Sequence, residues 1–107
     1  MSIMERCTQE INAEGWKVVG ELERAFEAAE EKMGGVPKKR RYLLMYGGQA
    51  QGTMVWEREW ESMAAIEAYG AKAETDPDFQ AAFKRVAGVF ANGRFELFAH
   101  FEDWVKS

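Results

Sequence analysis

The sequence predicts an α+β fold in which a four-stranded antiparallel sheet carries helices on one face. The hydrophobic period switches between that of a strand and that of a helix, in the order strand, helix, strand, strand, helix pair, strand. A glycine-bounded segment, residues 47–52, joins the two middle strands as a β-hairpin loop. The chain has 107 residues, of which 47% are hydrophobic. This length and composition suit a single domain, residues 1–107, with a substantial core.

The first strand and the first helix follow one another at the start of the chain. Residues 4–11 are mixed in character, and we expect a strand there because a clear helical pattern follows, with Asn12 as its N-cap. From Gly15 the apolar residues keep the spacing of one helix face: Val19, Leu22, Phe26, Ala29 and Met33. Five glutamates are expected largely on the opposite face: Glu21, Glu23, Glu27, Glu30 and Glu31. Gly34 and Gly35 end the helix.

Four basic residues, at positions 38–41, lead into a strand at residues 42–46. An anionic partner is one explanation for such a run, and a solvated strand entrance facing the acidic first helix is the one we favour. Two registers of the hairpin are distinguished by the sum of the residue numbers of opposed residues. A sum of 100 places Arg41 opposite Glu59 in the strand at residues 53–60, whereas a sum of 99 places it opposite Arg58, a like charge. We therefore predict the first register. One face of the hairpin then holds Tyr42, Leu44, Tyr46, Met54, Trp56, Arg58 and Trp60. The opposite face holds Arg41, Leu43, Met45, Val55, Glu57 and Glu59.

The last elements are two helices and a strand. Ser62 can cap a helix over residues 62–72, in which Ile66 and Tyr69 or Gly70 form a weak inward stripe. Asp76 and Pro77 open the next helix, whose apolar face is Phe79, Phe83, Val86 and Phe90. Asn92 and Gly93 predict a turn before a last strand at residues 94–101.

This element order is typical of a ferredoxin-like βαββαβ fold whose second helical segment is split in two. The strands carry apolar or aromatic residues on both faces, and the helices can cover only one of them. An uncovered aromatic face is a liability, so we expect a homodimer in which the two sheets pack together as a dimeric α+β barrel that encloses an apolar cavity.

Composition excludes several classes of protein. The net charge of -4 argues against nucleic-acid binding. One cysteine, Cys7, allows no intrachain disulfide, and one His with one Cys cannot supply a usual zinc site. The longest apolar run is too short to span a membrane, and the first residues do not have the pattern of a signal peptide. We therefore expect a cytoplasmic protein with no metal, no cofactor, no nucleic acid and no membrane among its partners.

Residues 52–79 also resemble a known family. A strand ends in Trp60, Ser62 and Met63 open a helix, and Asp76, Pro77 and Phe79 follow. This pattern resembles the NIPSNAP branch of the dimeric α+β barrel superfamily. The resemblance implies a dimer with a small-molecule cavity between sheet and helices, in a superfamily that includes cofactor-independent and haem-degrading monooxygenases. Haem degradation would need a histidine on the helix after Trp60, and residues 62–72 have none.

Few residues are candidates for chemistry. His100, the only histidine, is a weak candidate for a catalytic base, although a lone histidine is more often a surface or packing residue. Trp56, Arg58 and Trp60 form an aromatic-cation-aromatic row that, with Tyr42, can hold a flat anionic ligand. Packing at a dimer interface, with Arg58 stacked on Tyr42, explains the same row and is the explanation we favour.

Two further features have structural explanations beside the functional ones. Glu57 and Glu59 share a face and would raise each other's pKa if they were buried, but ion pairs with Arg41 explain them more simply. Cys7 can be a reactive thiol only if its pKa is lowered, and we expect a small buried apolar side chain instead.

Three functions agree with these patterns. We favour a dimeric barrel protein that binds a small apolar or aromatic molecule. The alternatives are a cofactor-independent monooxygenase-like enzyme and a dimerisation module without a ligand.

Overall fold

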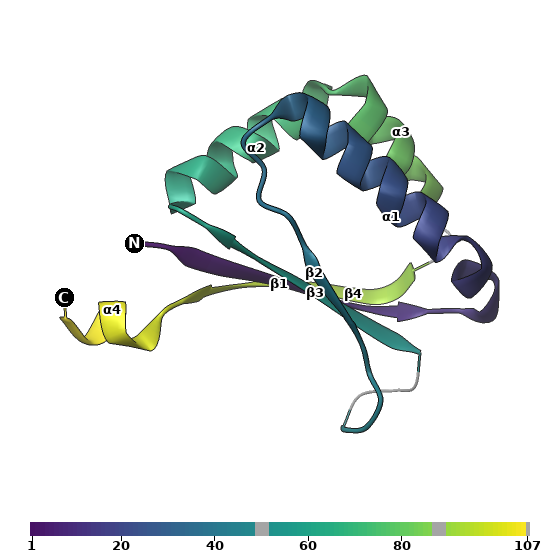
Figure 1. Cartoon of the computed structure of the whole chain (residues 1–107), viewed down its shortest axis with the longest axis horizontal. Coiled ribbons are helices and arrows are strands. Elements are labelled where there is room, and N and C mark those ends of the chain that lie inside the picture. Colours follow the sequence, from purple (N-terminus) through teal and green to yellow (C-terminus); the bar gives the residue numbers. More distant parts are fainter. Residues whose placement is uncertain (49–51, 87–89, 107) are drawn as a thin grey trace.

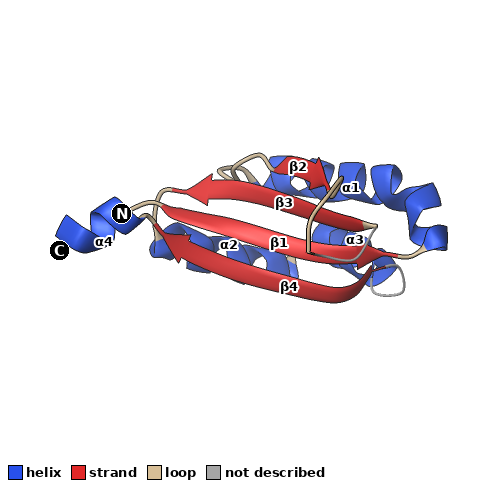
Figure 2. Cartoon of the chain, turned by 90° about the horizontal axis from the view of Figure 1, so that it is seen from below, coloured by secondary structure: helices blue, strands red, loops and turns tan. Residues whose placement is uncertain are grey.

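The computed structural model describes residues 1–48, 52–86 and 90–106, and it has the predicted element order followed by one further short helix (Figure 1). The elements, in chain order, are β1 (Ile3–Ile11), α1 (Ala13–Met33), β2 (Arg40–Leu43), β3 (Thr53–Trp60), α2 (Met63–Thr75), α3 (Pro77–Val86), β4 (Phe90–Ala99) and α4 (Phe101–Lys106). The strands form one antiparallel sheet in the order β2-β3-β1-β4, and α1, α2 and α3 all lie on the same face of it (Figures 1 and 2). The ferredoxin-like α+β fold is therefore confirmed.

The helix starts follow the predicted capping chemistry. Asn12 accepts a hydrogen bond from the backbone N–H of Gly15 at 2.7 Å, and Ser62 accepts one from Ala65 at 3.1 Å. Asp76 accepts one from the N–H of Phe79 at 2.8 Å, so Pro77 opens α3 as expected. Each cap satisfies a backbone donor that the first turn of a helix leaves unpaired.

The hairpin register differs from the prediction by three residues. Arg41 is opposite Trp56 and Tyr42 is opposite Val55, so the residue numbers of opposed residues sum to 97 rather than 100. Arg41 therefore lies on the helix side of the sheet, where its Nε donates to Glu23 of α1 at 2.7 Å and its Nη1 lies 3.5 Å from Glu27. The partners of Arg41 therefore lie on α1 and not on the neighbouring strand β3.

Three boundaries were also predicted wrongly. The strand predicted at residues 42–46 is β2, Arg40–Leu43. Phe90 begins β4 instead of continuing the helix of Phe79, and Asn92 and Gly93 lie inside that strand, where the pairing with β1 shifts by one residue opposite Gln9. Phe101 begins α4 instead of ending the strand.

The core lies between the sheet and the helices. One apolar cluster joins β1 to β3 through Cys7, Ile11, Met54 and Trp56, and a second joins α1 to α3 through Leu22, Phe26, Ala82 and Val86. Cys7 is fully buried, as predicted, and burial raises the pKa of its thiol to about 12.

The opposite, outer face of the sheet is more polar than we expected. The ion pair of Arg6 with Glu57, at 2.8 Å, lies there beside Glu96, together with the exposed rings of Tyr42 and Phe98. Glu57 thus pairs with Arg6, and Glu59 contacts His100, which corrects the prediction that both glutamates pair with Arg41. None of the described helices is both long enough and apolar enough to cross a bilayer.

Candidate functional site

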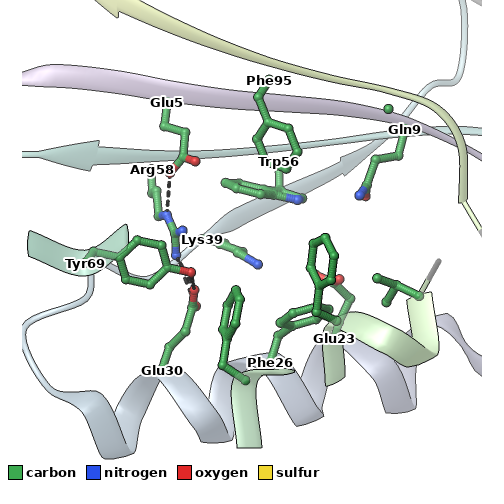
Figure 3. A pocket seen from close by; sticks show the side chains of 14 residues that line it. Glu5, Gln9, Glu23, Phe26, Glu30, Lys39, Trp56, Arg58, Tyr69 and Phe95 are labelled. Carbon is green, nitrogen blue, oxygen red and sulfur yellow. Dashed lines mark hydrogen bonds and ion pairs between the residues drawn. The ribbon is translucent and has the colours of Figure 1, made fainter. Parts of the chain in front are cut away.

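A cavity of about 350 Å³ lies between the helix-facing side of the sheet and helices α1, α2 and α3 (Figure 3). Its walls are largely aromatic, and a charged cluster of Arg58, Glu5 and Glu30 lies at one end (Figure 3). The residues that line it are Glu5, Gln9, Glu23, Phe26, Glu30, Lys39, Trp56, Arg58, Tyr69, Phe79, Phe83, Val86, Gly93 and Phe95. The rings of Phe83 and Phe95 line the cavity and are more than half exposed. The cavity therefore meets solvent between α3 and β4.

Strand alternation positions the sheet side of the cavity. Met54, Trp56, Arg58 and Trp60 recur at every second residue of β3 and are all at least 96% buried against the helices. On β1, Cys7 is opposite Trp56, and Glu5 is opposite Arg58. The two strands thus bring an arginine and a glutamate side by side beneath the helices.

Arg58 is the centre of the charged end. Its side chain is 2% exposed, and its Nε donates to Glu5 Oε1 at 2.7 Å. Its Nη1 donates to both carboxylate oxygens of Glu30, on α1, at 3.0 Å. Burial alone would lower the pKa of Arg58, but the charges of Glu30 and Glu5 outweigh burial and raise it. Arg58 is therefore always a cation, and its hydrogen bonds tie β3 to β1 and to α1.

Two aromatic side chains complete this cluster. Tyr69, on α2, donates its hydroxyl hydrogen to Glu30 Oε2 at 2.7 Å, and Trp60 donates its indole N–H to Glu5 Oε1 at 2.9 Å. The rings of Trp60 and Tyr69 lie 5.2 Å apart, and the Arg58 guanidinium lies about 5 Å from each ring centre. Burial, with the charge of Glu30, raises the pKa of the Tyr69 hydroxyl. Tyr69 therefore stays protonated and acts as a donor.

Lys39 enters the same cavity from the segment before β2 (Figure 3). Its Nζ lies 4.3 Å from the ring centre of Trp56 and 5.2 Å from that of Phe26. Burial lowers the pKa of Lys39, and the charges of Glu30 and Glu23 offset part of this effect. Within the basic run, Arg41 faces the acidic first helix, as expected. Lys39 packs on aromatic rings rather than in solvent, and Arg40 is opposite Glu57 on the outer face of the sheet.

The structure separates the predicted site residues. Trp56 and Arg58 line the cavity, whereas Trp60 is buried beside it and bonds Glu5. Tyr42 lies on the outer face of the sheet, so it neither shares the cavity nor stacks on Arg58. The cation stacks instead on Trp56, Trp60 and Tyr69. A ligand role for Trp56 and Arg58 stays a prediction.

His100 lies outside the cavity, between β4 and α4. Its Nε2 is 3.1 Å from Glu59 Oε2, and the side chain is 45% exposed. The hydrogen bond to Glu59 raises its pKa. No group of three or more potential metal ligands occurs among the residues that the structure describes.

Sequence reasoning missed most of the polar residues of the cavity. Glu23 and Glu30 were assigned to the solvent face of α1, but they flank Phe26 at helical spacing and are both 7% exposed. Their spacing of seven residues, with Phe26 between them, was the available signal. Glu5 and Gln9 lie on the same face of β1 as the buried Ile3, Cys7 and Ile11, since all five recur at every second residue. This spacing was a second signal for the cavity.

No protein-family model and no curated protein matches the sequence. Solved structures do match the fold. A NIPSNAP family protein from Agrobacterium tumefaciens is 14% identical over 92% of each chain, with a TM-score of 0.77. A dimeric protein of unknown function and ferredoxin-like fold from Bacteroides fragilis is 17% identical, with a TM-score of 0.68, over 92% of this chain and 96% of that one.

A third match is SnoaB from Streptomyces nogalater, described as a cofactor-independent oxygenase. It is 11% identical over 94% of this chain and 93% of its own, with a TM-score of 0.66. At these identities the likeness concerns the fold. The chain therefore has the ferredoxin-like fold of NIPSNAP family proteins, as the pattern of residues 52–79 predicted.

Proposed function

We propose that the chain forms a homodimer and that each copy binds a small aromatic or apolar molecule in the cavity between the sheet and the helices. The cavity itself is the main support. Its volume of about 350 Å³ falls in the range of small-molecule sites, which combine apolar walls with a few polar groups. A dimerisation module would have these side chains packed together, but Trp56, Phe26 and Phe79 leave open space between them.

Ligand binding is tested by titration with ethylnaphthalene, a neutral aromatic probe, followed by tryptophan fluorescence. Trp56 lines the cavity, so we expect a saturable change in its emission. Val86→Trp places a large ring at the cavity wall and should weaken binding at least about tenfold. Lys84→Trp adds the same ring two residues earlier on the exposed side of α3 and should not. Native mass spectrometry of the freshly purified protein then asks whether a molecule co-purifies. Equal affinity in both variants contradicts the proposal.

The outer sheet face supports the dimer. It carries exposed Tyr42 and Phe98, and a hollow lined by Arg6, Thr8, Val55 and Glu57, and the Bacteroides fragilis relative is described as dimeric. Val55→Glu adds a negative charge beside Glu57 and should shift the mass measured by light scattering toward that of a monomer. Ala68→Glu, on an exposed position of α2, should leave the mass unchanged. A wild-type chain that is monomeric at micromolar concentration refutes this part of the proposal.

A cofactor-independent oxygenase is the second candidate, because the fold matches that of SnoaB. In that case the cavity would hold a substrate that itself reacts with oxygen. Oxygen uptake during incubation with electron-rich aromatic substrates tests this idea, and the absence of uptake with a substrate shown to bind would exclude it for that substrate. We also propose a cytoplasmic location and no nucleic-acid partner, which the net charge of -4 and the single buried thiol support.

A further inference from the structure

Most polar groups of the cavity are already paired with one another. Both oxygens of Glu30 accept hydrogen bonds from Arg58, and one of them also accepts from Tyr69. Glu23 accepts from Arg41, and Glu5 accepts from Arg58 and Trp60. These groups are therefore already engaged with one another and offer little to a ligand.

Lys39 differs from the rest of the cluster. Among the residues that the structure describes, Lys39 makes cation–π contacts with Trp56 and Phe26 but no hydrogen bond or ion pair. An ammonium group carries three N–H donors and no acceptor. A ring face satisfies the charge in part and leaves donors available to a ligand oxygen.

Gln9 provides the complementary group. It hangs from β1 into the cavity (Figure 3), and its Oε1 is buried without a hydrogen-bond partner in the part of the chain that the structure describes. The register of β1 with β4 shifts at Gln9, and Gly93, which lines the cavity near this shift, has no side chain that could donate. A buried amide oxygen left unpaired is costly, and a hydroxyl or N–H of a ligand would remove that cost.

The charge balance narrows the class of ligand further. Arg58 is paired with two carboxylates, those of Glu5 and Glu30, so this cluster carries one negative charge in excess. Lys39 supplies the positive charge that balances it. A neutral carbonyl oxygen keeps the balance, whereas a ligand carboxylate would add a negative charge to a poorly solvated site. The charge balance thus disfavours the flat anionic ligand that was one of the two explanations for the row of Trp56, Arg58 and Trp60.

Resting on the proposed ligand binding, we propose that the cavity recognises neutral aromatic carbonyl compounds that also carry a hydroxyl group. The carbonyl oxygen accepts from Lys39, the hydroxyl donates to Gln9, and the ring system packs against Trp56, Phe26 and Phe79. Lys39 and Gln9 thus determine specificity, and the aromatic walls supply most of the affinity.

Four probes of similar shape test the proposal: ethylnaphthalene, acetylnaphthalene, acetylnaphthalene with a hydroxyl at the far end of the ring system, and naphthoate. In the wild-type protein we expect acetylnaphthalene to bind about tenfold more tightly than ethylnaphthalene, because a hydrogen bond to a charged donor is worth that factor. The added hydroxyl should improve binding again, by about fivefold, and naphthoate should bind less tightly than acetylnaphthalene.

Matched variants separate the two polar contacts. Lys39→Met keeps the unbranched part of the side chain but removes the ammonium group, and it should abolish the preference for acetylnaphthalene over ethylnaphthalene. Lys38→Met, at the exposed neighbouring position, should preserve it. Gln9→Leu should abolish only the gain from the hydroxyl. Each preference is a ratio within one variant, so a small change in stability does not mimic the result.

The outcomes distinguish this inference from the function on which it rests. If none of the four probes binds, the proposed function fails and this inference fails with it. If ethylnaphthalene binds saturably but all probes bind alike, or Lys39→Met keeps the preference, ligand binding stands and the assignment of Lys39 is refuted. Tighter binding of naphthoate than of acetylnaphthalene would overturn the choice of a neutral ligand.

Discussion

Replacing Arg58 by methionine should be one of the most damaging single substitutions in the described part of this chain. Arg58 is 2% exposed and forms hydrogen bonds with Glu5 and Glu30, which lie on two other elements. Methionine matches the arginine side chain only as far as Nε and carries no charge. The Arg58→Met variant therefore keeps the packing of the aliphatic part of the side chain but leaves two buried carboxylates without their cation.

The cost follows from the burial of those partners. The side chains of Glu5 and Glu30 are 13% and 8% exposed, so little water can replace the guanidinium. Removing one partner of a buried ion pair typically costs about 3–5 kcal/mol. For a domain of this size, such a loss lowers the melting temperature by roughly 12–40 °C. The exposed pair of Arg85 with Glu21 is the matched control, and its loss in Arg85→Met should cost below about 1 kcal/mol.

Urea unfolding followed by circular dichroism measures both variants at low temperature, where the weaker one is still folded. Arg58→Lys, which retains the charge but loses the planar fork, should lie between the wild type and Arg58→Met. The deficit of Arg58→Met should narrow toward acidic pH, because protonation neutralises the carboxylates left behind. A loss for Arg58→Met as small as that for Arg85→Met, or a loss independent of pH, would refute the idea of a buried, charge-compensated cluster.

Three further predictions concern other parts of the chain. Asn12→Ala should lower the free energy of unfolding by about 1 kcal/mol, since the Gly15 N–H loses its acceptor; an unchanged urea midpoint would contradict this. Burial raises the pKa of Cys7 to about 12, so a thiol reagent should modify only unfolded protein, and rapid labelling of the native state would disprove it. Glu59 raises the pKa of His100. Protonated His100 therefore stabilises the fold below its unfolded-state pKa of about 6.5, and this contribution is lost as pH rises through the higher folded-state value. An NMR titration should show a raised pKa for His100 in the wild type, and this pKa should fall toward the usual value for histidine in Glu59→Gln.

Local chemistry made the element order and the helix starts predictable. Asn12, Ser62 and Asp76 each cap a helix through a neighbour three residues away, so all the information lies within one turn. The alternation of Trp56, Arg58 and Trp60 likewise placed them on one face of β3. Such patterns need no knowledge of the rest of the fold.

Partners that are distant in sequence were not predictable in the same way. Arg41 was assigned to a neighbouring strand, but Glu23 on α1 is closer in the folded chain. Glu30 was assigned to the solvent face because it is charged, yet Arg58, from a strand 28 residues away, compensates its burial. The cavity depends on such pairs, which explains why the fold was clear from the sequence and most of the cavity was not.

The two ends of the cavity differ in how easily they can change shape. At one end, Arg58, Glu30 and Tyr69 hold β3, α1 and α2 together by hydrogen bonds, and any widening there would break several of them at once. At the other end, Phe83 is half exposed and packs on the Phe79 ring, which restrains it weakly. A bulky ligand would therefore enter past Phe83 and be accommodated by rotation of that ring. The hydrogen-bonded cluster of Arg58, Glu30 and Tyr69 would limit how deeply the ligand can bind.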